Sequence, residues 1–301
     1  MLEESDRTFG AVTVLVGEKT GKYPDGNSLR VRGRDATALI DPSLSVRRRA
    51  ATLGAIDLVV QSHVHEDHVA GLSRFPAARV TAHRADCLGL RDLDGLLEIY
   101  GYDAASGAVG AAVRAWVLEQ FHYAPRPDVE PYDAGAVFEL GGTRIRAIHL
   151  PGHTRGHSAL LIEPEGVLFL GDIDLTGFGP YYGDAWSNLD DFETSLARVR
   201  DIPARVWVSF HHAGVIEARD VFLAKLERFS ARIAAREAAL LEHLGEPRTL
   251  AALVAHRFLY PAHAQMAFID AAEARTITQH LARLVADGRV VECAPATWRR
   301  A

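Results

Sequence analysis

Residues 56–68 of this chain read IDLVVQSHVHEDH, and this stretch decides how the rest of the sequence is interpreted. Its first part is short, rich in β-branched residues and preceded by a turn-like Leu53-Gly54, which predicts a buried strand. Three histidines and Asp67 follow within six residues, where the strand ends. Imidazole and carboxylate groups lose hydration at such a place, so the pattern indicates a metal ion that replaces the water. Alternate residues of an extended tip point the same way, while Asp67 and His68 open the next turn and can face a second ion.

Further residues of metal-binding type lie along the chain, most of them directly after an apolar, strand-like run. They are Asp41 after residues 37–40, His153 in the loop after residues 144–150, Asp172 after residues 167–171, and His211 or His212 after residues 205–210. Counted with the pattern His63-x-His65-x-Asp67-His68, these are five ordered elements, four of which end a strand-like run. A set of this kind is hard to obtain by chance, and it resembles the signature of the metallo-β-lactamase superfamily.

The resemblance implies an α/β fold, the metallo-β-lactamase αββα sandwich, over residues 1–216. Helical periodicity over about residues 86–123 predicts a helical insertion between the second and third motifs. Residues 217–301 predict a long helix, two shorter helices and a hairpin-like finish, an order similar to the small winged-helix domain appended to some lactamase-like hydrolases. The third of these helices is not strongly basic, so packing or formation of a homodimer is favoured over nucleic-acid binding.

Composition restricts the possible roles of the protein. The 301 residues are 48% hydrophobic and 24% charged, which is ordinary for a globular protein with a substantial core. A formal charge of −6 disfavours a general attraction to nucleic acid but leaves room for a local basic patch. The acidic start of the chain is not followed by a signal-like apolar segment, and no run approaches the roughly 18 apolar residues of a membrane span. These features predict a cytoplasmic protein, whereas the small-molecule substrate is an expectation from the resemblance.

The resemblance also implies a role for each ligand. His63, His65 and His153 hold one ion, and Asp67, His68 and the last histidine hold another. Asp172 bridges the two ions, and Asp41 lies behind the histidine loop and orients it. The sequence Phe210-His211-His212-Ala213-Gly214 departs from the usual Gly-His-Gly ending, so the last ligand is His211 by preference, with His212 as the alternative. Imidazole and carboxylate donors without a thiolate suit zinc best, with manganese or iron possible.

Several other side chains are candidates for a substrate pocket. The insertion could form a lid, with Tyr100, Tyr102, His122 or Tyr123 facing the metals, although core packing is the commoner role of such aromatic residues. Asp174 follows Asp172 closely, and residues 177–183 predict an aromatic loop that lines the pocket through Tyr181 and Tyr182. We also expect a helix to begin at Val69, with its positive end toward the metals.

The predicted chemistry is hydrolysis by a hydroxide that bridges two divalent ions, with Asp67 and Asp172 as the catalytic carboxylates. The stretch from Pro151 to His157 is most similar to the glyoxalase II branch, which favours a small thioester or ester as the substrate. Two alternatives share the fold, an RNA endonuclease and a lactone or β-lactam hydrolase. A third alternative is a mononuclear iron persulfide dioxygenase, which the intact pair Asp67 and His68 disfavours.

Overall fold

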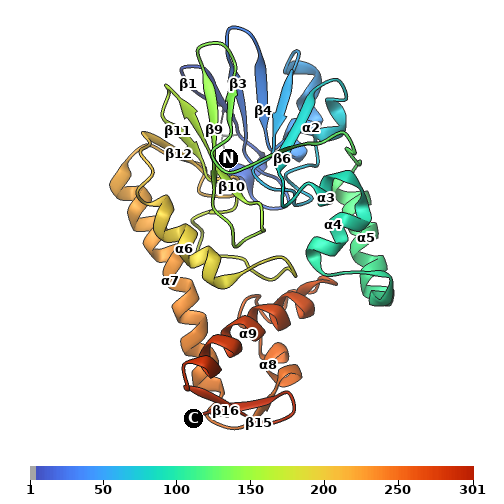
Figure 1. Cartoon of the computed structure of the whole chain (residues 1–301), viewed down its shortest axis with the longest axis vertical. Coiled ribbons are helices and arrows are strands. Elements are labelled where there is room, and N and C mark those ends of the chain that lie inside the picture. Colours follow the sequence, from blue (N-terminus) through green and yellow to red (C-terminus); the bar gives the residue numbers. More distant parts are fainter. Residues whose placement is uncertain (1–4) are drawn as a thin grey trace.

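Two β-sheets lie face to face in the upper half of the molecule, as Figure 1 shows for this computed structural model, which describes residues 5–301. The first sheet has the strand order β1-β2-β3-β4-β5-β6-β7. Its strands are antiparallel from β1 to β4 and parallel from β4 to β7. Their bounds are β1 Arg7–Phe9, β2 Val12–Leu15, β3 Ser28–Arg32, β4 Thr37–Ile40, β5 Leu58–Val60, β6 Arg79–His83 and β7 Glu130–Tyr132.

The second sheet has the order β13-β12-β11-β10-β9-β8 and is antiparallel except where β11 pairs with β12. Its bounds are β8 Val137–Glu139, β9 Arg144–His149, β10 Ser158–Glu163, β11 Val167–Phe169, β12 Val206–Val208 and β13 Val215–Ile216. The inner faces of both sheets meet in one apolar core that contains Leu29 and Val60 from the first sheet and Ile145 and Phe169 from the second. These residues alternate with outward-facing ones along each strand, as a sheet buried on one face requires.

Helices cover the outer face of each sheet, so the predicted αββα sandwich is confirmed (Figure 1). The first sheet is covered by α2 (Leu44–Arg49) and by the predicted insertion, which forms α3 (Leu88–Arg91), α4 (Leu93–Tyr100) and α5 (Gly107–Phe121). The second sheet is covered by α6 (Leu189–Val199) and the first half of α7 (Arg219–His243). Short or irregular turns occur at α1 (Glu18–Gly21), Ala50–Thr52, Leu72–Arg74 and Ala104–Ser106.

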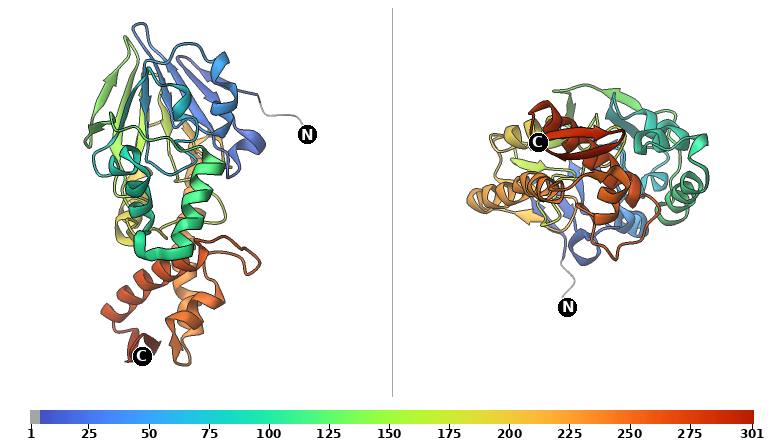
Figure 2. Two further views of the ribbon diagram at one scale, coloured as in Figure 1. Left: turned by 90° about the vertical axis from the view of Figure 1, so that its right-hand side faces the viewer. Right: turned by 90° about the horizontal axis from the view of Figure 1, so that it is seen from below.

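The C-terminal part of the chain lies below the sandwich, at the end of α7 (Figures 1 and 2). It contains α8 (Leu250–His256), α9 (Ile269–Ala286) and a small sheet of order β14-β16-β15, with β14 Arg248–Thr249, β15 Val290–Ala294 and β16 Thr297–Arg300. Helix α7 places Phe222 in the core of the sandwich and Leu240 in the C-terminal core. The division of the chain at residue 217 and the winged-helix likeness stay predictions. None of the helices within residues 5–301 has the length and apolar character of a membrane span.

The prediction that a helix begins at Val69 is wrong. After His68 the chain makes turns and then a short 3-10 helix, Leu72–Arg74. The backbone N–H of Gly71 donates to Pro42 O at 2.6 Å, and a Cβ at Gly71 would lie 2.9 Å from the same oxygen. This close approach of two backbone segments fixes a turn where an α-helix would need to continue. No helix N-terminus therefore adds its dipole to the site at this point.

Candidate metal centre

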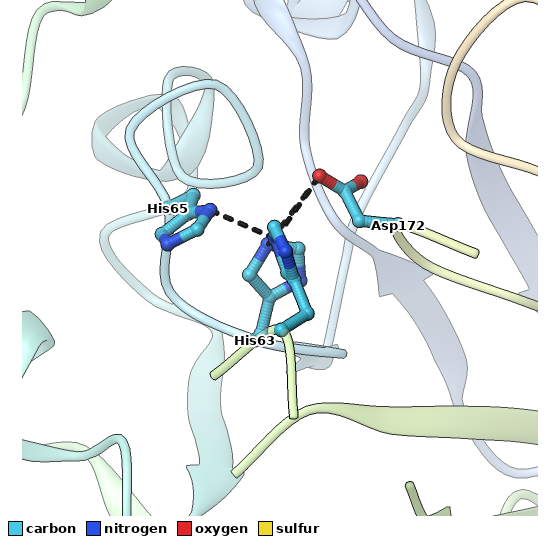
Figure 3. Close-up of side chains that lie close together, drawn as sticks. His63, His65 and Asp172 are labelled. Atoms are coloured by element: carbon cyan, nitrogen blue, oxygen red, sulfur yellow. Dashed lines mark hydrogen bonds and ion pairs between the residues drawn. The ribbon is translucent and has the colours of Figure 1, made fainter. Parts of the chain in front are cut away.

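The loops that follow β4, β5, β9, β11 and β12 bring their polar residues together, although these residues are far apart in the sequence. Potential ligand atoms of His63, His65, His153 and Asp172 all lie within 4.8 Å of one another. His153 Nε2 is 3.2 Å from His63 Nε2, 3.0 Å from His65 Nδ1 and 3.2 Å from Asp172 Oδ2. Figure 3 shows His63, His65 and Asp172 converging on one point. We call these four residues the first cluster.

A second cluster lies on the other side of Asp172 and consists of Asp67, His68 and His211. His211 Nε2 is 3.0 Å from Asp67 Oδ2, and His68 Nε2 is 3.8 Å from Asp67 Oδ1. Asp172 Oδ1 lies 2.9 Å from His68 Nε2, whereas its Oδ2 faces His153. One carboxylate therefore presents one oxygen to each cluster.

Backbone and side-chain acceptors hold the far nitrogen of each imidazole. His153 Nδ1–H donates to Tyr181 O at 2.9 Å, and His211 Nδ1–H donates to Gly21 O and Asp25 O at 3.1 and 3.0 Å. These bonds leave Nε2 of both rings as a lone pair directed at the cluster, which is the tautomer of a metal ligand.

Carboxylate oxygens and imidazole lone pairs face one another in the clusters, and a positive charge between them would stabilise this arrangement. The Nε2 lone pair of His211 faces a carboxylate oxygen at 3.0 Å, an arrangement that is repulsive unless a cation or a proton lies between them. Burial opposes a charge on His211, yet Asp172 and Asp67 raise its pKa to about 9 in the metal-free protein. The donor set, made of imidazoles and carboxylates around shared points, fits metal ions.

Asp41 lies behind the second cluster and is completely buried. Its Oδ2 accepts from His68 Nδ1 at 2.7 Å, its Oδ1 accepts from Ser62 N at 2.7 Å, and Ser62 Oγ also donates to it. These bonds orient His68 and hold the start of the histidine loop. His157 has a similar place behind Asp172, because its Nδ1–H donates to Leu150 O and its Nε2 accepts from the backbone N–H of Asp172.

Comparison with known proteins places this site in a family. The sequence profile of the metallo-beta-lactamase superfamily matches residues 24–228. The chain belongs to this superfamily. Its curated relatives include the acyl-coenzyme A thioesterase MBLAC2 of Bos taurus, 32% identical over 175 residues, and a hydroxyacylglutathione hydrolase of Synechococcus, 29% identical over 185 residues. These matches cover 52% and 58% of this chain and 61% and 58% of the relatives, so the chain spans about three fifths of their length.

Solved structures of the superfamily resemble the whole chain. A metallo-beta-lactamase family protein from Thermus thermophilus is 26% identical, with a TM-score of 0.70 over 97% of this chain and 99% of that one. A beta-lactamase domain protein from Burkholderia ambifaria has the same TM-score at 18% identity, over 99% of this chain and 94% of that one, which shows a shared fold. The similarity therefore includes the C-terminal part as well as the sandwich.

Of the two candidates for the last ligand in this superfamily member, His211 is buried in the second cluster and His212 is not part of it. His212 is exposed, with a positive φ of 45°, and lies at the edge of the cavity described below. The sequence left this choice open because the two histidines are adjacent and the usual glycines are missing.

A cavity of about 310 Å³ opens onto both clusters. Asp174 and Tyr181 line it, as do Tyr100 and Tyr102 of the insertion. Tyr182 is not among the lining residues, in contrast to the prediction, because its ring is buried in the core and its hydroxyl bonds to His280 Nε2 at 2.9 Å. Tyr123 is likewise buried away from the cavity, where its hydroxyl donates to Gly89 O, and His122 is exposed at the end of α5.

Two carboxylates at the site, Asp184 and Glu66, could not be recognised from any sequence motif and were not predicted. Asp184 Oδ2 lies 2.9 Å from His65 Nε2, and its Oδ1 accepts from Tyr181 Oη at 3.0 Å. Burial lowers the pKa of His65, but Asp184 outweighs this effect and raises the pKa to about 9 in the metal-free protein. Because Nε2 of His65 faces Asp184, Nδ1 of the same ring faces the first cluster. Glu66, an unspecified position of the His-x-His-x-Asp-His pattern, accepts from the hydroxyls of Tyr23 and Tyr100.

The C-terminal part also contributes to the cavity, which sequence reasoning did not foresee. The contributing residues come from the connection between α8 and α9 and from the start of α9, namely Tyr260, Met266, Phe268, Ala272 and Arg275. Spacing within the C-terminal helices gave no sign of this, because contact with the cavity depends on how α7 places them below the sandwich (Figure 1). The cavity is thus enclosed by residues of all three parts of the chain.

Proposed function

We propose that this protein is a hydrolase that uses two divalent metal ions to cleave a small thioester or ester. The observation that carries this proposal is the division of the Asp172 carboxylate between two clusters. His63, His65, His153 and one oxygen of Asp172 would hold one ion, while Asp67, His68, His211 and the other oxygen would hold the second. A mononuclear iron dioxygenase would not need the complete second cluster.

The relatives favour a thioester. One is named an acyl-coenzyme A thioesterase and another a hydroxyacylglutathione hydrolase, and both names describe the cleavage of a carbonyl–sulfur bond. Since each match spans only about three fifths of the relative, the substrate of this chain is proposed from the site as well as from the names. Zinc as the native metal, a cytoplasmic location, a homodimer and a winged-helix-like C-terminal domain belong to the same proposal.

When bound, two divalent ions would lower the pKa of a shared water toward about 7 and stabilise negative charge on the attacked carbonyl oxygen. The residues of the chain supply the rest. Asp172 keeps the two clusters at a fixed separation, and Asp41 and His157 keep His68 and Asp172 in place. Asp67 lines the cavity and would hold the second ion through one carboxylate oxygen, which leaves the other oxygen to take up the proton that the water loses and to give it to the departing sulfur or oxygen. Aromatic side chains that line the cavity, among them Tyr100, Tyr102 and Tyr181, limit the access of bulk water to the reacting carbonyl.

The cavity does not suit a folded RNA. Phosphates need an open, basic approach, but five carboxylates of the described residues line this cavity, namely Glu66, Asp67, Asp172, Asp174 and Asp184. Arg144 and Arg146 of β9, which could have offered a basic path for RNA, both pair with Glu163 and are not among the residues that line the cavity. A lactone or β-lactam remains chemically compatible with the clusters and is included in the test.

The test is a substrate panel on protein that has been stripped with a chelator and reloaded with zinc, manganese or iron. We expect the reloaded protein to cleave a short acyl thioester faster than a lactone, nitrocefin or single-stranded RNA, and the stripped protein to cleave none of them. Rapid RNA cleavage with a steep salt dependence would contradict this proposal and show that the protein is an RNA endonuclease.

A further inference from the structure

The cavity has an apolar end that the hydrolytic chemistry does not use. Four aromatic rings follow one another there, from α5 through the α8–α9 connection to the aromatic loop. Trp116 lies 5.3 Å from Phe268, Phe268 lies 6.1 Å from Tyr260, and Tyr260 lies 5.5 Å from Phe178 between ring centroids. We call these four residues the aromatic wall. Spacings of this size are typical of stacked or edge-to-face pairs, so the wall is a packed surface.

The wall leads to a second, smaller hollow of about 130 Å³ between α5 and residues 266–268. Val113, Trp116, Met266 and Phe268 line both the hollow and the main cavity. In addition, Ala112 and Ala267 line the hollow alone. Every side chain around the hollow is apolar in its body, so the apolar surface extends beyond the main cavity.

The charges of the main cavity do not fit an anionic substrate tail. Within residues 5–301, Arg275 is the single arginine or lysine that lines the cavity. Its guanidinium donates to Gly101 O at 2.9 Å and Gly183 O at 3.4 Å, and lies over the Tyr102 ring. These contacts hold the guanidinium against the protein's own backbone, and the carboxylates that line the cavity outnumber this one cation.

The carboxylates of the cavity do not fit a cationic tail either, because the protein's own groups engage them. Glu66 accepts from two tyrosine hydroxyls, Asp184 contacts His65 and Tyr181, and Asp174 accepts from the backbone N–H and hydroxyl of Thr176. The charged groups of the cavity suit neither an anionic nor a cationic tail, and much of the remaining lining is apolar. Both features favour an uncharged, apolar ligand.

We infer that the aromatic wall and the second hollow form an acyl slot, which takes the uncharged acyl chain of the substrate while the reacting carbonyl lies at the two clusters. This inference rests on the proposed function and names its substrate class, a neutral acyl thioester or ester. Common thiol carriers end in phosphates or carboxylates, and the carrier therefore lies outside the slot. Met266 and Ala267 set the length of chain that the slot accepts.

The first experiment measures kcat/KM for thioesters from acetyl to octanoyl on one neutral carrier, N-acetylcysteamine. Each buried methylene should raise kcat/KM about fourfold until the slot is filled. The butyryl thioester should be cleaved at least about tenfold faster than the succinyl thioester, because the second carboxylate of succinate would be buried without a partner. A flat chain-length series, or equal rates for butyryl and succinyl, would overturn the slot.

Variants that fill the hollow locate the slot. Met266→Trp and Ala267→Trp should each reduce kcat/KM for the octanoyl thioester at least about tenfold more than they reduce kcat/KM for the acetyl thioester. Val285→Trp is the matched control, because Val285 is as exposed as Met266, at 41%, but lies on α9 outside the cavity. The inference is wrong if both hollow variants keep the wild-type chain-length profile, or if the control changes it as much.

A binding experiment separates the slot from the reaction. N-ethyl amides of the same acids should not be cleaved readily, and their affinity can be measured by calorimetry on the full-length protein. Affinity that rises with chain length and falls in Met266→Trp supports the slot even if no thioester is hydrolysed, in which case only the proposed function fails. Hydrolysis of thioesters without any chain-length dependence of amide affinity supports the function and overturns the slot.

Discussion

Asp41 orients a candidate metal ligand, His68, and the start of the histidine loop through hydrogen bonds. Its carboxylate accepts from His68 Nδ1 and from both donors of Ser62, and none of it is exposed to solvent. Asp41→Asn keeps the shape of the side chain but removes the charge that supports the His68 tautomer. We expect metal affinity to fall about 10- to 100-fold, measured by chelator competition. Unchanged affinity in a variant with wild-type circular dichroism would show that Asp41 does not orient the ligand.

His211 and His212 are adjacent histidines, of which only His211 lies in the second cluster, so their alanine variants form a matched pair. His211→Ala should reduce the metal content from about two ions per chain to about one, because the second cluster loses a buried ligand. The exposed neighbour provides the control, and His212→Ala should keep both ions. Elemental analysis of the two purified variants decides the matter, and equal metal loss in both would contradict the assignment.

The candidate ligands could be predicted from the sequence because they follow short apolar strands, and the ends of these strands, from both sheets, meet at one edge of the sandwich. Asp184 and Glu66 could not be predicted in this way. Asp184 reaches His65 only after the chain has passed through the aromatic loop, and Glu66 becomes significant only because Tyr23 and Tyr100 approach it from separate segments. Contacts of this kind depend on tertiary packing and leave no local pattern.

At the scale of elements, the aromatic loop is fixed from outside by α7. The buried Arg236 donates Nη2–H to Phe178 O at 2.6 Å and Nη1–H to Pro180 O, and its guanidinium lies over the rings of Phe178 and Tyr182. Arg236→Met should lower the free energy of unfolding by about 3 kcal/mol and raise KM more than it changes kcat, since two charged hydrogen bonds are lost. Denaturant unfolding and steady-state kinetics measure both effects.

The control for this element is Arg228→Met, on the same helix but exposed to solvent. It should change neither stability nor KM appreciably, and Arg236→Lys should restore part of the loss. If Arg236→Met left KM and stability at wild-type values, the loop would not depend on α7. The helical insertion could be predicted from its periodicity, whereas the turn at Gly71 could not, because it results from contact with Pro42.

At the scale of the whole molecule, α7 joins two apolar cores. Phe222 and Phe229 belong to the core over the second sheet, and Leu240 and Leu244 belong to the C-terminal core. A single rigid helix shared in this way should make the chain unfold in one cooperative transition. Leu240→Ala, which creates a buried cavity, should shift the whole transition by about 2–5 kcal/mol. Two separated calorimetric peaks, of which only one responds to Leu240→Ala, would contradict this coupling.

The proposed hydrolysis needs both clusters, joined by Asp172. The most direct measurement is a titration of stripped protein with zinc, in which thioester hydrolysis is recorded against equivalents of metal per chain. We predict activity that rises until two equivalents are bound, and an Asp172→Asn variant that folds but loses most turnover at any zinc level, because a neutral amide cannot bridge two ions. Full activity at one equivalent, or wild-type kcat in Asp172→Asn, would show that hydrolysis does not need two bridged ions.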